Sequence, residues 1–171
     1  YYTRFNSFMG LLNTGGIDAG SGLPIAEFSS FAATFKGLEA DGKLNLTDHL
    51  DLTMRGDYVH ATNQDNGDPL PRIAPLRLGA GLQYQKNSLG ARLEMLHAFK
   101  QDRTADNELS TDSYTNVSAL VTYQLPTKLH LQLYAKASNL LNQEIREHTS
   151  FLKDVAPLGG RALVIGLHAD F

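Results

Sequence analysis

The residues with the greatest potential for chemistry lie close together near the C-terminal end of the sequence. Glu147, His148 and Asp154 fall within one short polar segment. Imidazole nitrogen and carboxylate oxygen are ligands that zinc and related divalent metals accept. We therefore predict a substrate-binding contact at His148, Glu147 and Asp154, with His148 as the metal ligand. A hydrogen bond from His148 that only orders its loop fits the sequence equally well.

A hydrolytic site is the other chemistry that this segment suggests. Ser150 lies beside His148 and Asp154, which supplies the residue types of a nucleophile, a base and an acid. All three lie in one flexible loop without rigid support, and the sequence has no glycine-rich phosphate loop or nucleophile elbow. We predict that the chain is not an enzyme and needs no cofactor.

The elements that must hold this segment are β-strands, and the last strand is the clearest. Between Arg161 and Phe171 apolar or small side chains occupy every second position, which predicts a strand with one apolar face. By itself this stretch also fits an edge strand of a soluble protein. Outer-membrane barrels, however, commonly end on an aromatic residue that the closing strand carries to the membrane interface.

The same two-residue period recurs along the chain and predicts eight strands. Segments of about ten residues with this period have the length that a tilted strand needs to cross a bilayer. In residues 31–44 the apolar positions change parity, and we expect a β-bulge near Lys36 and Gly37 to restore one continuous face. The expected strands are residues 1–12, 31–44, 50–58, 76–84, 89–96, 116–123, 129–138 and 161–171.

The connections between these strands alternate in length. Short turns are expected at 45–49, 85–88 and 125–128, and long loops at 13–30, 61–74, 101–113 and 142–160. Outer-membrane barrels have short periplasmic turns and long extracellular loops. Aromatic residues also fall at both ends of the strands, as interfacial belts do. We assign Tyr84, Tyr123 and Phe171 to the periplasmic belt and Tyr58, Phe99 and Tyr114 to the opposite one. Together these patterns predict an all-β, antiparallel transmembrane β-barrel.

Composition agrees with this fold and excludes other classes. No apolar run approaches the roughly 20 residues of a membrane-spanning helix. The net charge of -3 gives no reason to expect a nucleic-acid partner. The absence of cysteine excludes disulfides and thiolate metal sites. No signal peptide opens the sequence, so we expect a mature or internal segment of an exported protein.

Several short motifs resemble the C-terminal region of TonB-dependent receptors. NLLNQ at 139–143 and HTSFLKD at 148–154 precede APLGGR at 156–161, like the motifs around the last loop of these receptors. Residues 36–39 (KGLE) resemble their Gly-x-Glu strand, and residues 69–75 resemble a proline-rich loop that leads back into the barrel. The final motif, carried by Pro157, Gly160 and Arg161, is one residue longer than usual. The resemblance covers essentially the whole chain.

This resemblance implies the last eight strands of a 22-stranded barrel, with residues 1–171 as its C-terminal segment and the N-terminal plug domain absent. It implies active import across the outer membrane of a Gram-negative bacterium, energised by TonB through the plug. The loop motifs are most similar to zinc-uptake receptors, although haem and siderophore importers share them. Phe171, with Leu167 and Ile165, is then the signal that the barrel-assembly machinery reads. The expected partners are outer-membrane lipid, the plug, the preceding strands, TonB and a zinc, haem or siderophore ligand.

The strand parity also assigns faces to the remaining charged residues and histidines. His60 and His97 are expected at the membrane interface and His49 in a solvated turn, with His130 and His168 as lumen-facing neighbours that pack against the plug. The alternative to a receptor is a self-contained eight-stranded barrel that acts as an adhesin or structural anchor. Lumen-facing charges are expected to pair with one another, the plug or water: Arg55, Asp57, Arg77, Arg92, Glu94 and Lys136.

Overall fold

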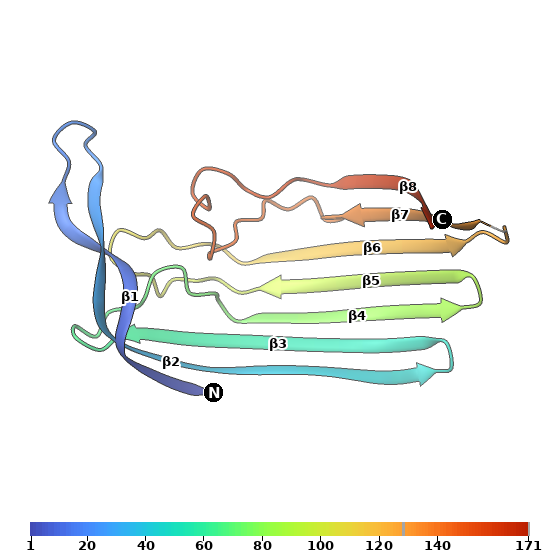
Figure 1. Ribbon diagram of the computed structural model, residues 1–171, viewed down its shortest axis with the longest axis horizontal. Helices are drawn as coiled ribbons and strands as arrows, with labels where there is room; N and C mark the ends of the chain where they lie inside the picture. The colour runs from blue at the N-terminus through green and yellow to red at the C-terminus, as the bar shows by residue number, and fades with distance from the viewer. Residues whose placement is uncertain (128, 171) are drawn as a thin grey trace.

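Eight antiparallel β-strands follow one another along the chain and pair in the same order (Figure 1). The computed structural model describes residues 1–127 and 129–170. The predicted all-β fold and its eight strands are therefore confirmed. The strands are β1 (Tyr2–Ile17), β2 (Pro24–Thr47), β3 (Leu50–Asn63), β4 (Arg77–Lys86), β5 (Leu89–Ala98), β6 (Tyr114–Gln124), β7 (His130–Ser138) and β8 (Ala162–Asp170).

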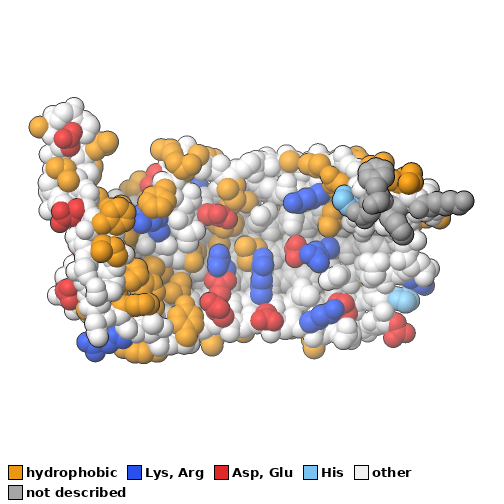
Figure 2. All heavy atoms as spheres, in the orientation of Figure 1, with side chains coloured by type: hydrophobic (Ala, Val, Ile, Leu, Met, Phe, Trp, Pro, Cys, Tyr) orange, Lys and Arg blue, Asp and Glu red, His pale blue; other side chains and the backbone are white. Residues whose placement is uncertain are grey.

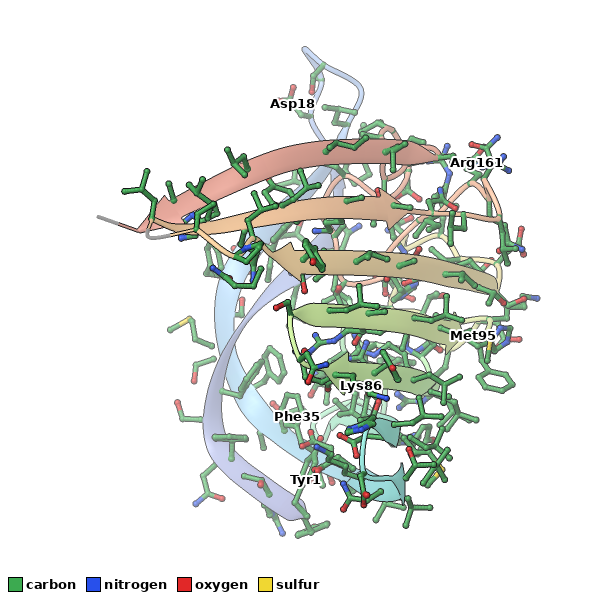
Figure 3. All side chains as sticks on the ribbon, turned by 90° about the vertical axis from the view of Figure 1, so that its right-hand side faces the viewer. Tyr1, Asp18, Phe35, Lys86, Met95 and Arg161 are labelled. Carbon is green, nitrogen blue, oxygen red and sulfur yellow. The ribbon has the colours of Figure 1, made fainter. Side chains whose placement is uncertain are left out.

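The strand register divides the side chains between two faces of one curved sheet. Because side chains alternate along a strand, directly paired residues lie on the same face. Asp57 pairs with Arg77 and Glu94 with Gly81, so the charged positions share one side, which we call the charged face. Leu82 pairs with Leu93 on the other side, the apolar face. The view along the strands in Figure 3 shows Met95 and Phe35 on opposite sides of the sheet.

The sheet is open in the part of the chain that the structure describes. Its order begins at β1 and ends at β8, and each of these strands has one neighbour. Ile165 and Leu167 of β8 lie on the apolar face with exposed side chains, as the alternation predicts. Phe171, the third residue of the predicted assembly signal, lies outside the described residues. No described helix is long and apolar enough to cross a membrane.

The connections separate by length between the two ends of the sheet, as predicted (Figure 1). Short turns join β2 to β3, β4 to β5 and β6 to β7 at one end. Residues 64–76, 99–113 and 139–161 form the long loops at the other end. We call these two ends the turn end and the loop end.

The predicted loop at 13–30 is wrong, because most of it is β-structure. β1 continues to Ile17 and β2 begins at Pro24, which leaves a tight turn at 18–23. Asp18 closes this turn with two groups. Its carbonyl accepts from the backbone N–H of Gly22 at 2.8 Å, and its carboxylate accepts from the backbone N–H and the hydroxyl of Ser21. Glycine and polar residues that suggested a loop thus form the end of a long hairpin. Its outer half runs across the direction of the other strands (Figure 1).

The predicted β-bulge near Lys36 and Gly37 is also wrong. The pairing of β2 with β3 runs without a shift from Ala33 to Asn45. The apolar positions change parity because the loop end of the charged face is itself apolar. Phe31 and Ala33 are buried on that face by a loop residue, Leu70. An irregularity occurs instead in β1, where the register shifts between Phe5 and Phe8.

That irregularity lets four aromatic rings gather on the charged face at its loop end. A bulge in β1 brings both Phe5 and Phe8 to this side although they are three positions apart. The rings of Phe8 and Phe35 are 5.3 Å apart, and Phe8 also contacts Phe31 at 5.7 Å. Such tilted and edge contacts suit aromatic pairs. Figure 2 shows hydrophobic side chains gathered toward this end of the charged face.

The aromatic belts are confirmed in part. Tyr84 and Tyr123 lie on the apolar face at the turn end, and Tyr58 lies on the apolar face toward the loop end. Tyr114 does not belong to this belt, because it pairs with Ala98 on the charged face. Tyr114 is the first residue of β6, so no alternating pattern precedes it in the sequence to indicate its face.

Candidate functional site

The charged face carries a band of acidic and basic side chains across the middle of the sheet (Figure 2). Arg77 and Asp57 are direct cross-strand partners. The guanidinium group of Arg77 donates from Nε to both carboxylate oxygens of Asp57 at 2.9 and 3.2 Å, and its Nη2 lies 2.9 Å from Oδ2. Two-point contact of this kind fixes the geometry as well as the charge. For Arg77 and Asp57, the predicted pairing of inward charges is confirmed.

A hollow of about 330 Å³ beside this pair is lined by Arg55, Arg92 and Glu94, together with glycines of β4. Arg55 lies across Gly79, where a Cβ atom would come within 2.8 Å of the Cγ and Nε atoms of Arg55. Because Gly79 has no side chain, the side chain of Arg55 can lie across it. The hollow offers a polar wall with charges of both signs, which suits contact with a polar protein surface or solute.

The three long loops meet in a buried group of polar side chains, which we call the loop cluster: Glu108, Thr111, His148 and Lys153. Glu108 stands at its centre, with only 8% of its side chain exposed. One of its carboxylate oxygens, Oε1, accepts from the backbone N–H of Arg72 at 2.9 Å, and the other accepts from Ala105 N–H at 3.1 Å. Arg72 lies in the loop between β3 and β4. Glu108 itself lies between β5 and β6, so one carboxylate joins two loops.

The third loop, between β7 and β8, reaches the same carboxylate with two side chains. The Lys153 ammonium donates to Oε1 of Glu108 at 3.4 Å and to the carbonyl oxygen of Leu109. His148 Nε2 lies 3.2 Å from the same Oε1. Thr111 Oγ1 lies 3.0 Å from the other ring nitrogen, Nδ1. The cluster thus ties three separate loops to one buried acid.

The tautomer of His148 follows from its neighbours. Lys153 Nζ lies 3.4 Å from Nδ1 and, as an ammonium, can only donate. Nδ1 therefore accepts, which leaves the ring proton on Nε2, toward the carboxylate. That N–H does not point along the line of a hydrogen bond, so Nε2 has no hydrogen-bond partner within the described part of the chain although Glu108 is 3.2 Å away. The attraction between His148 and Glu108 is therefore electrostatic rather than directional.

Further contacts hold the loops against the sheet. Arg103 donates from Nη1 to the carbonyl of Ala61 at 2.7 Å and from Nη2 to Thr62 at 2.8 Å. The guanidinium group of Arg72 lies 3.9 Å from the ring centre of Phe151, in a cation–π contact. The loop end is consequently an ordered cap rather than a set of independent loops.

The protonation of Glu108 should control the order of this cap. Burial alone raises the pKa of this carboxyl, but the contact with His148 and the N–H groups of Arg72 and Ala105 outweigh burial and lower the pKa from the usual 4.5 to about 2. A lowered pKa stabilises the folded loops at every pH above 4.5, by about 3 kcal/mol. That contribution is lost as the pH falls from 4.5 toward 2. We expect hydrogen exchange in residues 99–113 and 139–161 to accelerate across that range, before exchange in the strands. Equal acceleration in strands and loops would contradict this prediction.

The structure separates the three predicted ligand residues. His148 is buried in the loop cluster, whereas Glu147 and Asp154 have exposed side chains. Among residues 1–127 and 129–170, no group of three or more His, Asp or Glu side chains has an arrangement suited to a metal ion. The hydrogen bond that orders a loop, the alternative for His148, matches its contact with Thr111.

His49, His60, His97 and His168 lie where the sequence predicts them. His60 and His97 are on the apolar face, and His97 Nδ1 lies 2.9 Å from Thr115 Oγ1. His49 is exposed in its turn. His168 pairs with Gln132 and His130 with Asp170, which puts both backbone positions on the charged-face side of the register.

Sequence reasoning missed the two residues that matter most in the cap, Glu108 and Lys153. Lys153 is part of the HTSFLKD motif, from which the prediction took only His148 and Asp154. Glu108 lies about 40 positions earlier, in a polar loop with no periodic pattern. No local signal marks a residue whose partners are all distant in sequence.

Comparison with known proteins places the chain beside outer-membrane receptors. A family model described as "TonB dependent receptor-like, beta-barrel" matches residues 1–140. A solved structure titled "Copper transporter OprC" matches with a TM-score of 0.84 over 97% of this chain, at 18% sequence identity. At that identity the likeness concerns the fold. The present chain spans 27% of the length of that structure's chain.

Proposed function

The chain belongs to the TonB-dependent receptor family, in the part that forms the β-barrel, and from this premise we propose that it is a wall segment of an outer-membrane importer. The match of the family model to residues 1–140 carries the proposal. The two faces of the sheet support it. An apolar face with exposed leucines and valines suits lipid, and a face with paired charges suits a hydrated interior.

The segment takes the place of the last eight strands in a barrel of 22, and residues 1–171 form its C-terminal part. The plug domain and the other strands precede it in the complete receptor. The plug packs against the charged face, where Arg55, Arg92 and Glu94 have no salt-bridge partner within the described residues. TonB acts through the plug. The barrel-assembly machinery reads the end of the last strand at Ile165, Leu167 and Phe171.

The imported substrate is a scarce metal or a metal complex. The loop motifs resemble zinc-uptake receptors, and the name of the structural neighbour refers to copper, so zinc and copper are the first ions to test. Haem and siderophore complexes follow. Exposed Glu147 and Asp154 are open to an arriving substrate, whereas His148 first has to leave the loop cluster. We therefore propose that His148 orders the cap, and that Glu147 and Asp154 offer the first contact.

Metal accumulation by cells that carry the complete receptor tests this function. We expect more cell-associated zinc or copper, measured by mass spectrometry under metal starvation, and no gain in cells without TonB. The double variant Glu147→Gln, Asp154→Asn should lower uptake severalfold, since each exposed carboxylate contact with a cation contributes about 0.2 to 1 kcal/mol. Asp106→Asn, another exposed loop carboxylate that does not line the hollow beside Glu147 and His148, is the matched control. Uptake that is independent of TonB, for metals as well as for haem and siderophores, would refute the import function.

The alternative of a self-contained adhesin or anchor requires closure between β1 and β8. The described sheet has no pairing between these strands. Cross-linking cysteines placed at Tyr2 and Leu163, which both lie on the apolar face, in the complete protein separates the two functions. Efficient cross-linking between these edge strands would favour the small closed barrel.

A further inference from the structure

All charged side chains that point to the apolar face from the described strands are positive. Each Asp and Glu of β1 to β6 lies on the charged face, as the register shows for Glu39, Asp41 and Asp57 in β2 and β3. The basic side chains on the apolar face are Arg4 of β1, Lys36 of β2 and Lys86 of β4. Lys86 lies at the turn end, whereas Arg4 and Lys36 lie toward the loop end.

The cations toward the loop end lie at about the same height along neighbouring strands, and we call this row of side chains the basic level. Lys36 pairs with Tyr2 on one side and with His60 on the other. Arg4 pairs with Thr34, one step farther along the same face. The next apolar-face residue of β2 after Lys36 is Leu38, which is 71% exposed, and uncharged residues continue from there. The basic level therefore borders directly on the exposed apolar belt.

The loop between β5 and β6 adds two more cations to this level. β4 pairs with β3 only as far as Asp57, and beyond it the loop between β3 and β4 folds back along β3, with a bridge from Pro69 to Thr62. Arg103, from the loop between β5 and β6, reaches the same end of β3 through its bonds to Ala61 and Thr62. Lys36 is the direct cross-strand partner of His60, and Arg103 bonds to Ala61 and Thr62, the two residues that follow His60.

A hollow of about 270 Å³ lies beside this part of β3 on the outside of the sheet. Its lining includes Tyr58, His60, Phe99, Lys100 and Arg103. Asp102 is the one acid there, and its contact with Lys100 is loose, at 3.8 Å between well-exposed groups. The hollow thus combines aromatic rings with an excess of positive charge, immediately above the belt that faces lipid.

We propose that this hollow, with Lys36 beside it, binds a phosphate group of an anionic glycolipid in the outer leaflet of the membrane. The acyl chains of the lipid then cover the apolar belt below, while the basic groups of Lys36, Lys100 and Arg103 hold its phosphate. Aromatic rings suit this depth because they have an apolar body and a polar edge. The proposal rests on the outer-membrane location proposed above, which puts the loop end outside.

Lipid retention by the complete receptor tests the site. The purified protein in detergent is mixed with bisphosphorylated lipid A, or with the same lipid after its phosphates are removed, and bound lipid is counted by native mass spectrometry. Each cation near an anionic headgroup contributes about a fivefold change in binding. We therefore expect the double variant Lys36→Gln, Lys100→Gln to bind the bisphosphorylated lipid roughly 25-fold more weakly.

Lys86→Gln is the matched control, because it removes a cation from the same face at the turn end. It should retain lipid as the unmodified protein does. Arg103→Lys keeps the charge but loses two-point contact with β3, so retained lipid with this variant assigns the effect to charge rather than to folding. Three results would each overturn the proposal. The Lys86 variant could lose as much lipid as the double variant, the dephosphorylated lipid could bind equally well, or millimolar inorganic phosphate could displace the lipid. Metal uptake measured in parallel reports on the import function separately.

Discussion

Replacing Glu108 by glutamine is expected to release the three long loops from one another while the strands stay folded. Glutamine keeps the size of the side chain but removes the negative charge that Lys153 and His148 approach. Lys153, with 5% of its side chain exposed, would remain as a buried cation without a counter-charge. Loss of one partner of a buried pair costs about 3 to 5 kcal/mol. We expect hydrogen exchange in residues 99–113 and 139–161 to accelerate by two to three orders of magnitude.

The same loops provide a control for this prediction. Glu144 contacts Arg146 at 2.6 Å, but its side chain is 65% exposed, so Glu144→Gln should change exchange by less than fivefold. Adding Lys153→Met to Glu108→Gln removes the orphan cation and should restore part of the protection. Unchanged exchange in Glu108→Gln, or equal effects of the two glutamine variants, would mean that Glu108 does not hold the cap together.

Replacing Gly37 by valine is expected to prevent correct pairing of β2 with β3. A Cβ atom at Gly37 would overlap the backbone carbonyl oxygen of Tyr58 and come within 2.7 Å of the Tyr1 ring. Backbone cannot move aside as a flexible side chain can. Overpacking of this kind costs about 1 to 3 kcal/mol, and more where backbone has to shift. We expect most of the complete receptor with this substitution to stay unfolded, as measured by heat-modifiable migration in gels.

Gly42 on the same strand offers the comparison. No atom lies within 4 Å of a Cβ added there. Gly42→Val should therefore give as much folded protein as the unmodified chain, and a β-branched residue even favours the strand. Equal yields of folded protein from the two valine variants would show that the close approach at Gly37 has no effect on assembly.

The positions and faces of the later strands could be predicted from the sequence. The alternation in β4 to β8 predicted their positions to within a few residues and their faces correctly, including the apolar positions Leu163, Ile165 and Leu167. A two-residue period is local information, because each side chain's face depends only on its place in the strand. The motifs of the last loop also pointed to the receptor family that the comparison found.

The long hairpin of β1 and β2 shows where local patterns mislead. Gly15, Gly16 and Gly20 suggested a loop at 13–30, whereas cross-strand hydrogen bonds keep this segment extended. The apolar positions of β2 change parity after Phe35, which suggested a bulge. The change instead marks where the charged face is no longer covered by the loop residue Leu70, which buries Phe31 and Ala33. In both cases the deciding contacts come from residues that are distant in sequence.

The sequence by itself determined the fold class, the two faces of the sheet and the resemblance to a receptor barrel, because these depend on side-chain period and on contiguous motifs. Only the tertiary structure decided which loop residues act together. Glu108 and His148 are 40 positions apart and meet because β6 and β7 return the chain to the loop end. Likewise, Lys36 and Arg103 come near each other only because the loop between β5 and β6 folds onto the end of β3, beyond its pairing with β4.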